Sequence, residues 1–100
     1  MGNGFKVLWT DHALSELKQT VEFLETNWTE KELEKFASKL DHTIEIISKN
    51  PEIFPVSFEK NVVRKAVVDK YNTLYYRVKE NTIEVVSLFA TRQDPNKKKI

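Results

Sequence analysis

The fold is decided by three segments in the second half of the chain: VVRKAVV at residues 62–68, LYYRV at 74–78 and IEVVSLF at 83–89. β-Branched and aromatic residues dominate all three, which is the composition typical of β-strands. The connections at residues 69–72 and 79–81 are short and contain Asp and Asn, so they suit tight turns. Short turns join antiparallel neighbours, and the three segments therefore predict a β-meander.

Upstream of these strands, apolar residues recur at spacings of three and four and predict two helices, over about residues 11–27 and residues 29–50. Thr10-Asp11 supplies an N-cap for the first helix, and Thr29 begins a capping box for the second. Pro51 ends the second helix because the residue before a proline is displaced from the α region. The expected apolar stripes are Leu14, Leu17, Val21 and Leu24 in the first helix and Leu33, Phe36, Ala37, Leu40, Ile44 and Ile47 in the second.

The chain begins with one more strand signal. FKVLW at residues 5–9 is short, aromatic and β-branched, and it predicts a strand before the first helix. Residues 51–55 form a proline-bracketed connector in which Ile53 and Phe54 can pack under the helices, and residues 56–58 can add a short strand. The predicted fold class is α+β: a small β-α-α-β-β-β domain whose N-terminal strand and helical hairpin pack on a mainly antiparallel sheet.

Length and composition limit the kind of protein. One hundred residues suit a single domain over residues 1–100, with flexible ends expected at residues 1–4 and 96–100. The chain has no cysteine, which excludes disulfides, thiol catalysis and cysteine-ligated zinc. No apolar run reaches the roughly 18 residues of a membrane span, and the N-terminus lacks a signal core, so we expect a cytoplasmic protein without membrane association. Gly2 and Gly4 cannot form a phosphate-binding glycine loop, and we expect no cofactor and no metal.

Charge is divided unevenly along the chain. Residues 1–59 contain 6 Lys/Arg and 11 Asp/Glu, a net charge of −5, whereas residues 60–100 contain 10 and 4, a net charge of +6. The overall charge of +1 conceals this division. The basic strand half is expected to face an anion, either nucleic acid or an acidic protein, while the acidic helical half stays in solvent.

Basic and aromatic residues on the strands could bind such an anion. Alternation places Arg64 and Lys65 on opposite faces of one strand, and Arg77 on the face opposite Tyr76. The face that the helices leave uncovered is expected to display a subset of Arg64, Arg77, Tyr75 and, at the end of the sheet, Arg92. Guanidinium groups bind phosphates and tyrosine rings stack on unpaired bases, so this set could hold RNA.

The same residues have a structural alternative. An Arg on an exposed strand is more often a cross-strand ion-pair or solubility residue, by about three to one. Because Tyr75 and Tyr76 are adjacent, one of them is expected in the core. His12 and His42 fall in the predicted helices, far in sequence from the basic strands, so histidine is not expected to act as a general base on the sheet.

The order of elements and several stretches of sequence resemble the RelE/ParE superfamily of bacterial type II toxins. The stretches in the strand half are residues 62–68, 74–78 and 83–95. The superfamily tends to place a basic residue, an acidic residue and a proline after the last strand, as Arg92 and Asp94-Pro95 do here. The opening Trp9-Thr10-Asp11-His12-Ala13 also resembles the superfamily's start, and the likeness covers nearly the whole chain.

The resemblance implies one half of a toxin–antitoxin pair: a bacterial growth inhibitor, of the kind used in plasmid stabilisation, neutralised by a cognate antitoxin in a hetero-oligomer. An acidic antitoxin segment would cover the basic sheet face. ParE-like members bind and inhibit DNA gyrase, which is the mechanism we expect. The alternatives are a RelE-like endonuclease that cuts mRNA on the ribosome and a decayed toxin that only binds its partner.

The two active mechanisms need different residues. For a ribosome-dependent endonuclease, the resemblance places Arg64 and Arg92 where members carry a functional basic residue, and the strand pattern adds Arg77. Target or nucleic-acid binding is assigned to Lys65, Tyr75 and Arg92. Ala66 and Thr73 stand where other RelE-like members are basic, and no histidine or tyrosine follows Arg92. Lys and Arg hold their protons near pH 7, so a general acid and base are poorly provided, which favours the gyrase mechanism.

Overall fold

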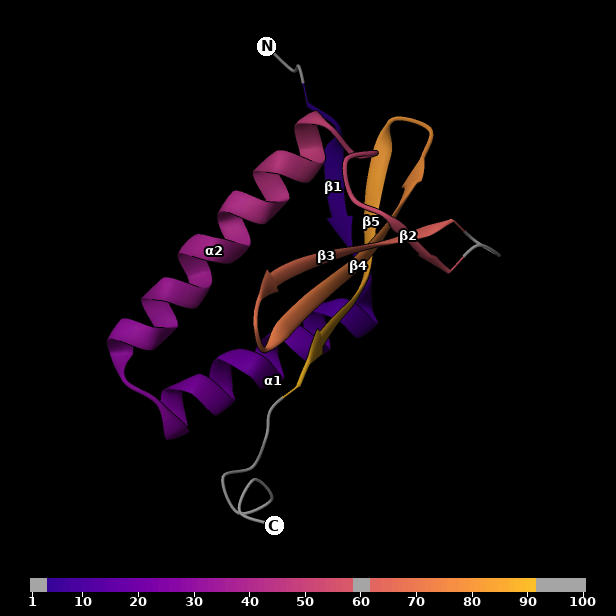
Figure 1. Ribbon diagram of the computed structural model, residues 1–100. Helices are drawn as coiled ribbons and strands as arrows, with labels where there is room; N and C mark the ends of the chain where they lie inside the picture. Colours follow the sequence, from indigo (N-terminus) through magenta and orange to yellow (C-terminus); the bar gives the residue numbers. More distant parts are fainter. Residues whose placement is uncertain (1–3, 59–61, 92–100) are drawn as a thin grey trace.

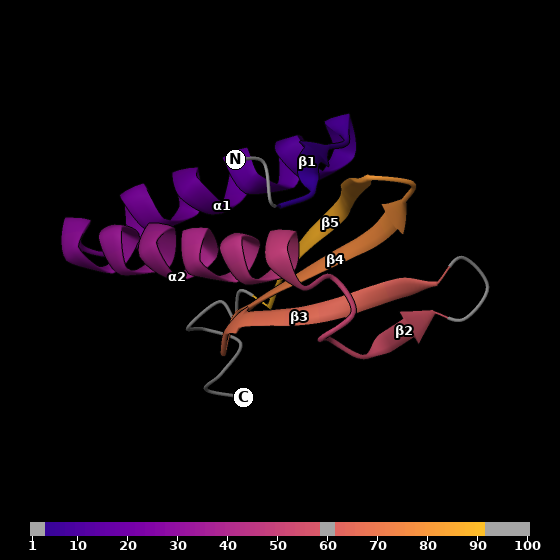
Figure 2. The same cartoon turned by 90° about the horizontal axis from the view of Figure 1, so that it is seen from above.

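The computed structural model describes residues 4–58 and 62–91. Its elements are β1 (Lys6–Trp9), α1 (Asp11–Asn27), α2 (Glu30–Lys49), β2 (Val56–Phe58), β3 (Val63–Asp69), β4 (Asn72–Lys79) and β5 (Thr82–Ala90). The described strands form one sheet, and both helices cover the same face of it (Figures 1 and 2). The predicted α+β class, with a helical hairpin on a mainly antiparallel sheet, is confirmed.

The strand order across the sheet is β1-β5-β4-β3-β2. The meander predicted from the sequence is β3, β4 and β5, and the short strand predicted at residues 56–58 is β2, antiparallel to β3. At the opposite edge, β1 pairs in parallel with β5, with Lys6 opposite Thr82 and Trp9 opposite Val85. The strand at the start of the chain was predicted, whereas its parallel pairing with β5 was not.

Both helices begin at the predicted caps. The Thr10 hydroxyl accepts a hydrogen bond from the Ala13 N–H at 3.1 Å, and the Thr29 hydroxyl accepts one from the Glu32 N–H at 3.2 Å. α2 ends one residue before the Asn50-Pro51 step, as expected for a residue that precedes proline. Local signals therefore set the helix boundaries.

The core lies between the helices and the side of the sheet beneath them, which we call the helix-covered face. α2 buries Phe36, Leu40 and Ile47, as predicted. The largest fully buried side chains are Tyr76, Ile47, Leu74, Ile83, Leu88, Val85 and Thr20. Most of them come from β4 and β5, so the centre of the meander is also the centre of the core.

Two members of the predicted apolar stripes are exposed, and the prediction was wrong for them. Leu14 is 47% exposed, while Ala13 and Thr20 of α1 are buried. In α2, Ala37 is exposed. α1 packs against β5 through its small buried residues, because a small side chain lets a helix approach a strand closely. Leu17 and Leu24 still pack against the core, so the buried face of α1 is shifted from the predicted stripe towards Ala13 and Thr20.

Neither helix in the described residues combines the length and the hydropathy needed to cross a membrane. The flexible ends expected at residues 1–4 and 96–100 lie outside the described residues, apart from Gly4. Gly4 is exposed, and the chain is held from the next residue on, where the Phe5 N–H donates to the Ser48 carbonyl at 2.7 Å.

Candidate functional site on the outer face of the sheet

The side of the sheet turned away from α1 and α2 is the candidate site, and we call it the outer face. In β4, Leu74 and Tyr76 are buried under the helices, so alternation turns Tyr75 and Arg77 to the outer face. The register places their neighbours beside them. The outer face includes Lys6 and Leu8 of β1, Lys65 and Val67 of β3, Thr73, Tyr75, Arg77 and Lys79 of β4, and Thr82, Glu84 and Phe89 of β5.

Lys65 and Tyr75 are direct cross-strand partners in the middle of the outer face. Lys65 is exposed and Tyr75 is partly buried. Tyr76 has no exposed surface, which confirms that one of the two adjacent tyrosines lies in the core. The structure thus brings together two of the three predicted binding residues, a cation and an amphipathic ring.

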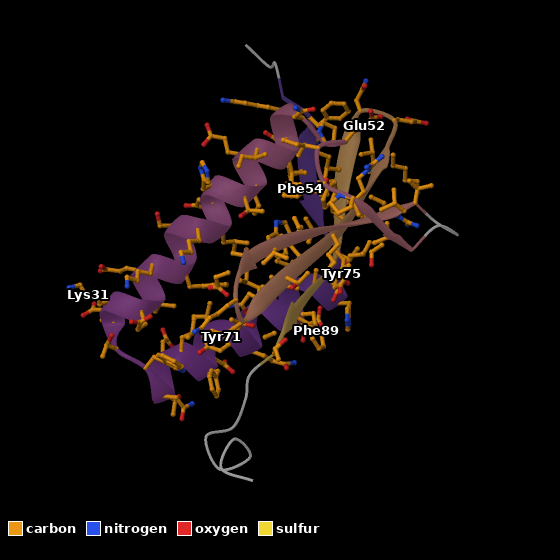
Figure 3. All side chains as sticks on the ribbon, in the orientation of Figure 1. Lys31, Glu52, Phe54, Tyr71, Tyr75 and Phe89 are labelled. Atoms are coloured by element: carbon orange, nitrogen blue, oxygen red, sulfur yellow. The ribbon has the colours of Figure 1, made fainter. Side chains whose placement is uncertain are left out.

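One end of the outer face is apolar. Val67 and Phe89 flank Thr73 in one cross-strand row, and they are 58% and 53% exposed. Figure 3 labels Tyr75 and Phe89, which lie on the side of the sheet remote from α2. Exposed large apolar side chains in one row are more typical of a protein-binding surface than of one that holds phosphates.

The other end of the outer face holds an ion pair. Arg77 of β4 lies opposite Glu84 of β5, and the Arg77 Nε donates to the Glu84 Oε1 at 2.6 Å. Arg77 thus forms a cross-strand ion pair of the kind that the structural alternative describes. The guanidinium charge is balanced within the sheet, so Arg77 does not present a free cation.

Arg64 lies on the helix-covered face, in the same cross-strand row as Tyr76. Its Nη1 donates to the backbone carbonyls of Phe54 at 2.7 Å and Glu52 at 3.4 Å, residues labelled in Figure 3. The structure therefore does not bring Arg64 together with Arg77 and Tyr75. The guanidinium holds the connector between α2 and β2 against the sheet.

Tyr76 holds the same connector. Its hydroxyl donates to the Pro51 carbonyl at 2.6 Å, and its ring meets the Phe54 ring edge to face, with centroids 6.4 Å apart. Burial raises the pKa of Tyr76 to about 12, although the Arg64 guanidinium and the Phe54 N–H act in the opposite direction. Arg64 and Tyr76 are thus structural partners beneath the connector.

A family model described as the ParE toxin of the type II toxin–antitoxin system parDE matches residues 7–95. The chain belongs to the ParE toxin family. The resemblance to the RelE/ParE superfamily, noted from the strand segments and the chain's ending, is confirmed. Among curated proteins, no relative matches at a significant level.

Solved structures share the fold of this ParE-family toxin. A chain of the chromosomal ParDE toxin–antitoxin system from P. aeruginosa is 14% identical, with a TM-score of 0.73, over 90% of this chain and 99% of that one. The YoeB/ParE toxin from Agrobacterium tumefaciens is 15% identical, with a TM-score of 0.59, over 85% and 96%. A chain of the E. coli DinJ-YafQ toxin–antitoxin complex is 12% identical, with a TM-score of 0.57, over 87% and 92%. At these identities the likeness establishes the fold.

The remaining predicted residue of the ParE-family toxin, Arg92, lies outside the described residues, so its roles stay predictions. The strand that precedes Arg92, β5, is hydrogen-bonded to helix α1. The Glu16 carboxylate of α1 accepts hydrogen bonds from the Ser87 hydroxyl at 2.7 Å and the Leu88 N–H at 2.8 Å. β1 pairs with β5 only as far as Val85, so the Leu88 N–H has no partner on β1 and donates to Glu16 instead.

Sequence reasoning missed Glu84 on the outer face of the toxin, although a signal for it was present. A two-residue turn, Glu80-Asn81, sets Lys79 opposite Thr82, and counting two residues further along each strand sets Arg77 opposite Glu84. His12 and His42 are exposed on the helices, away from the outer face. The described residues contain no cluster of three His, Cys, Asp or Glu side chains that could hold a metal ion.

Replacing Arg64 by Met is expected to destabilise the toxin by about 1–3 kcal/mol, because it leaves the Phe54 carbonyl without its charged donor. Urea unfolding measures the loss. Lys65→Met removes a charge from the next residue, which is exposed, and should change stability by less than about 0.5 kcal/mol. An Arg64→Met protein with wild-type stability but no toxicity would instead support a direct role for Arg64 in the toxin's action.

Proposed function

We propose that this toxin arrests growth by binding and inhibiting DNA gyrase, and that a cognate antitoxin neutralises it. The position of Arg64 is the observation that favours gyrase inhibition over the RelE-like mechanism. Its guanidinium is engaged by two backbone carbonyls on the helix-covered face, so one of the basic residues required by the RelE-like reading is turned away from the outer face. The family match over residues 7–95, to a ParE model, supports the same choice.

The outer face suits a protein ligand. It offers exposed apolar anchors in Val67 and Phe89 and an exposed cation in Lys65. An acidic antitoxin segment could bury the anchors while its carboxylates approach the lysine, and the charge attraction would speed association. A related fold occurs in the E. coli DinJ-YafQ toxin–antitoxin complex, which supports a partner of this kind.

A supercoiling assay with purified gyrase and relaxed plasmid tests the mechanism. We expect the toxin in molar excess to prevent supercoiling, and a purified cognate antitoxin to restore it. Lys65→Glu should weaken inhibition at least about tenfold, because it reverses a charge at the centre of the outer face. Lys70→Glu makes the same change in the β3–β4 turn, outside the outer face, and should have a much smaller effect.

Supercoiling that stays normal with folded protein that still arrests growth would rule out gyrase as the target. Expression without growth arrest would instead indicate a decayed toxin that only binds its partner. Both outcomes leave the fold and the family assignment intact, so the assay separates mechanism from identity.

The alternative is a ribosome-dependent mRNA endonuclease, and the pairing of Lys65 with Tyr75 on the outer face favours it. A lysine beside an aromatic ring could hold a nucleotide through its phosphate and its base. Primer-extension mapping of mRNA ends on programmed ribosomes tests this reading. Cleavage by the wild type that is absent with Arg92→Ala would establish the endonuclease and place Arg92 in its site.

A further inference from the structure

Glu84 is the single acidic residue among the outer-face residues defined above, and it lies at the end where cations gather. We propose that Glu84 is a specificity-determining residue: paired with Arg77, it keeps the phosphates of nucleic acid from binding the outer face and leaves that face to a protein ligand. The inference rests on the proposed function in one respect, that the outer face is the binding surface of the toxin.

The position of the Arg77–Glu84 ion pair in the sheet favours its stability in solution. The two residues are Cα partners in adjacent antiparallel strands, so the backbone register holds their side chains side by side. The Nε–Oε1 distance is 2.6 Å, and the side chains are only 35% and 28% exposed. Partial burial reduces the screening by salt that makes fully exposed pairs weak.

Cations surround Glu84 on the outer face. Arg77 is its direct partner, and two residues along the strands the register aligns Lys6 of β1, Thr82 of β5 and Lys79 of β4 in one row. Glu80 adds a second carboxylate in the adjoining turn, where it is exposed. Removing the charge of Glu84 would leave three cations at the end of the sheet and release the guanidinium between them.

Phosphate and protein ligands respond differently to this arrangement. Arginine binds phosphate through two parallel donors. The side-on pair of Arg77, which includes Nε, is engaged by Glu84, and the negative charge of Glu84 repels a phosphate that approaches the remaining donors. A protein ligand can instead place an apolar side chain beside Leu8, which is 48% exposed and directly opposite Glu84 on β1. The protein ligand can also donate a hydrogen bond to the Glu84 carboxylate. The carboxylate therefore discriminates between the two ligand classes.

Binding of a fluorescein-labelled single-stranded RNA oligonucleotide, followed by anisotropy at several salt concentrations, tests the proposal. We expect the wild-type toxin to bind weakly and Glu84→Gln to bind about five- to tenfold more tightly at low salt. The slope of log K against log salt should steepen by about 0.7, the value for one added phosphate contact on a single strand. Glu84→Gln removes the charge that holds the guanidinium but nearly preserves the size of the side chain, so misfolding would not account for a gain in binding. Glu84→Ala, which also removes the acceptor oxygen, provides a second variant.

Two further variants locate the gain in binding, and the second of them separates the pair from net charge. Glu84→Gln combined with Arg77→Gln should return RNA binding to about the wild-type level, because no guanidinium is then released. Glu80→Gln removes the same charge from the neighbouring turn and should change binding less than twofold. An unchanged affinity for Glu84→Gln and Glu84→Ala, or an equal gain for Glu80→Gln, would overturn the inference.

The outcome is independent of the gyrase assay. If supercoiling is unaffected but Glu84→Gln gains RNA affinity through Arg77, the proposed target is wrong and the role of Glu84 stands. Tight, Arg77-dependent RNA binding by the wild type would refute the role of Glu84 directly, whatever the toxin does to gyrase.

Discussion

Leu40→Asp is expected to prevent folding of the toxin. Leu40 lies on the buried face of α2 between Phe36 and Ile47, and it is 7% exposed. A carboxylate there would lie among the apolar residues of the core, and the core cluster in the described residues contains no cation to pair with it. The cost is about 4 kcal/mol or more, which approaches the whole stability of a small domain. Circular dichroism should show a largely unfolded protein at neutral pH.

Leu14→Asp is the matched control for this prediction. The substitution is the same, but Leu14 is 47% exposed on α1, so the carboxylate stays hydrated. We expect a change in stability of less than about 1 kcal/mol. A Leu40→Asp protein that melts normally would mean that α2 does not pack as described.

Tyr76 should make the toxin unusually sensitive to alkaline pH. Its pKa is raised from 10.0 to about 12 by burial, so between these values the folded state keeps a proton that the unfolded state has lost. The stabilisation from this group is therefore complete below pH 10 and is lost as the pH rises towards 12. The expected loss is about 2–3 kcal/mol, measured by urea unfolding at each pH.

Tyr76→Phe separates the hydroxyl from the ring. At pH 7 the variant should be less stable by about 1–3 kcal/mol, because the buried Pro51 carbonyl loses its donor at 2.6 Å. Above pH 10 the difference from the wild type should shrink, since phenylalanine does not titrate. Tyr75→Phe, made at the partly buried neighbour, should leave the alkaline loss in place. A wild-type stability that falls no faster than that of Tyr76→Phe would contradict the raised pKa.

Most element boundaries could be predicted because they depend on local signals. The Thr10 and Thr29 caps, the Asn50-Pro51 step and the turns of the meander each act over a few residues, and the structure reproduces them. The position of Glu84 also depends on a local signal, although sequence reasoning did not use it. Its pairing with Arg77 follows from a turn of two residues, so it was available from the sequence once the register was counted.

The candidate site was predicted only in part. Lys65 and Tyr75 do lie together on the outer face, whereas Arg64 does not join them. Strand alternation determines that Arg64 and Lys65 point in opposite directions, but the direction of the helical layer decides which of them is covered. That direction depends on contacts such as the Tyr76 hydroxyl with Pro51, 25 residues apart in the chain.

The sequence by itself determined the elements of this toxin, its family resemblance and the separation of acidic helices from basic strands, because each of these depends on residue type and short-range spacing. Only the tertiary structure decided which face of the sheet is open, that β1 pairs with β5, and that Glu16 secures Ser87 from 71 residues away. These features arise from packing two layers around one core, where the energy of a contact does not depend on how far apart its residues lie in the chain.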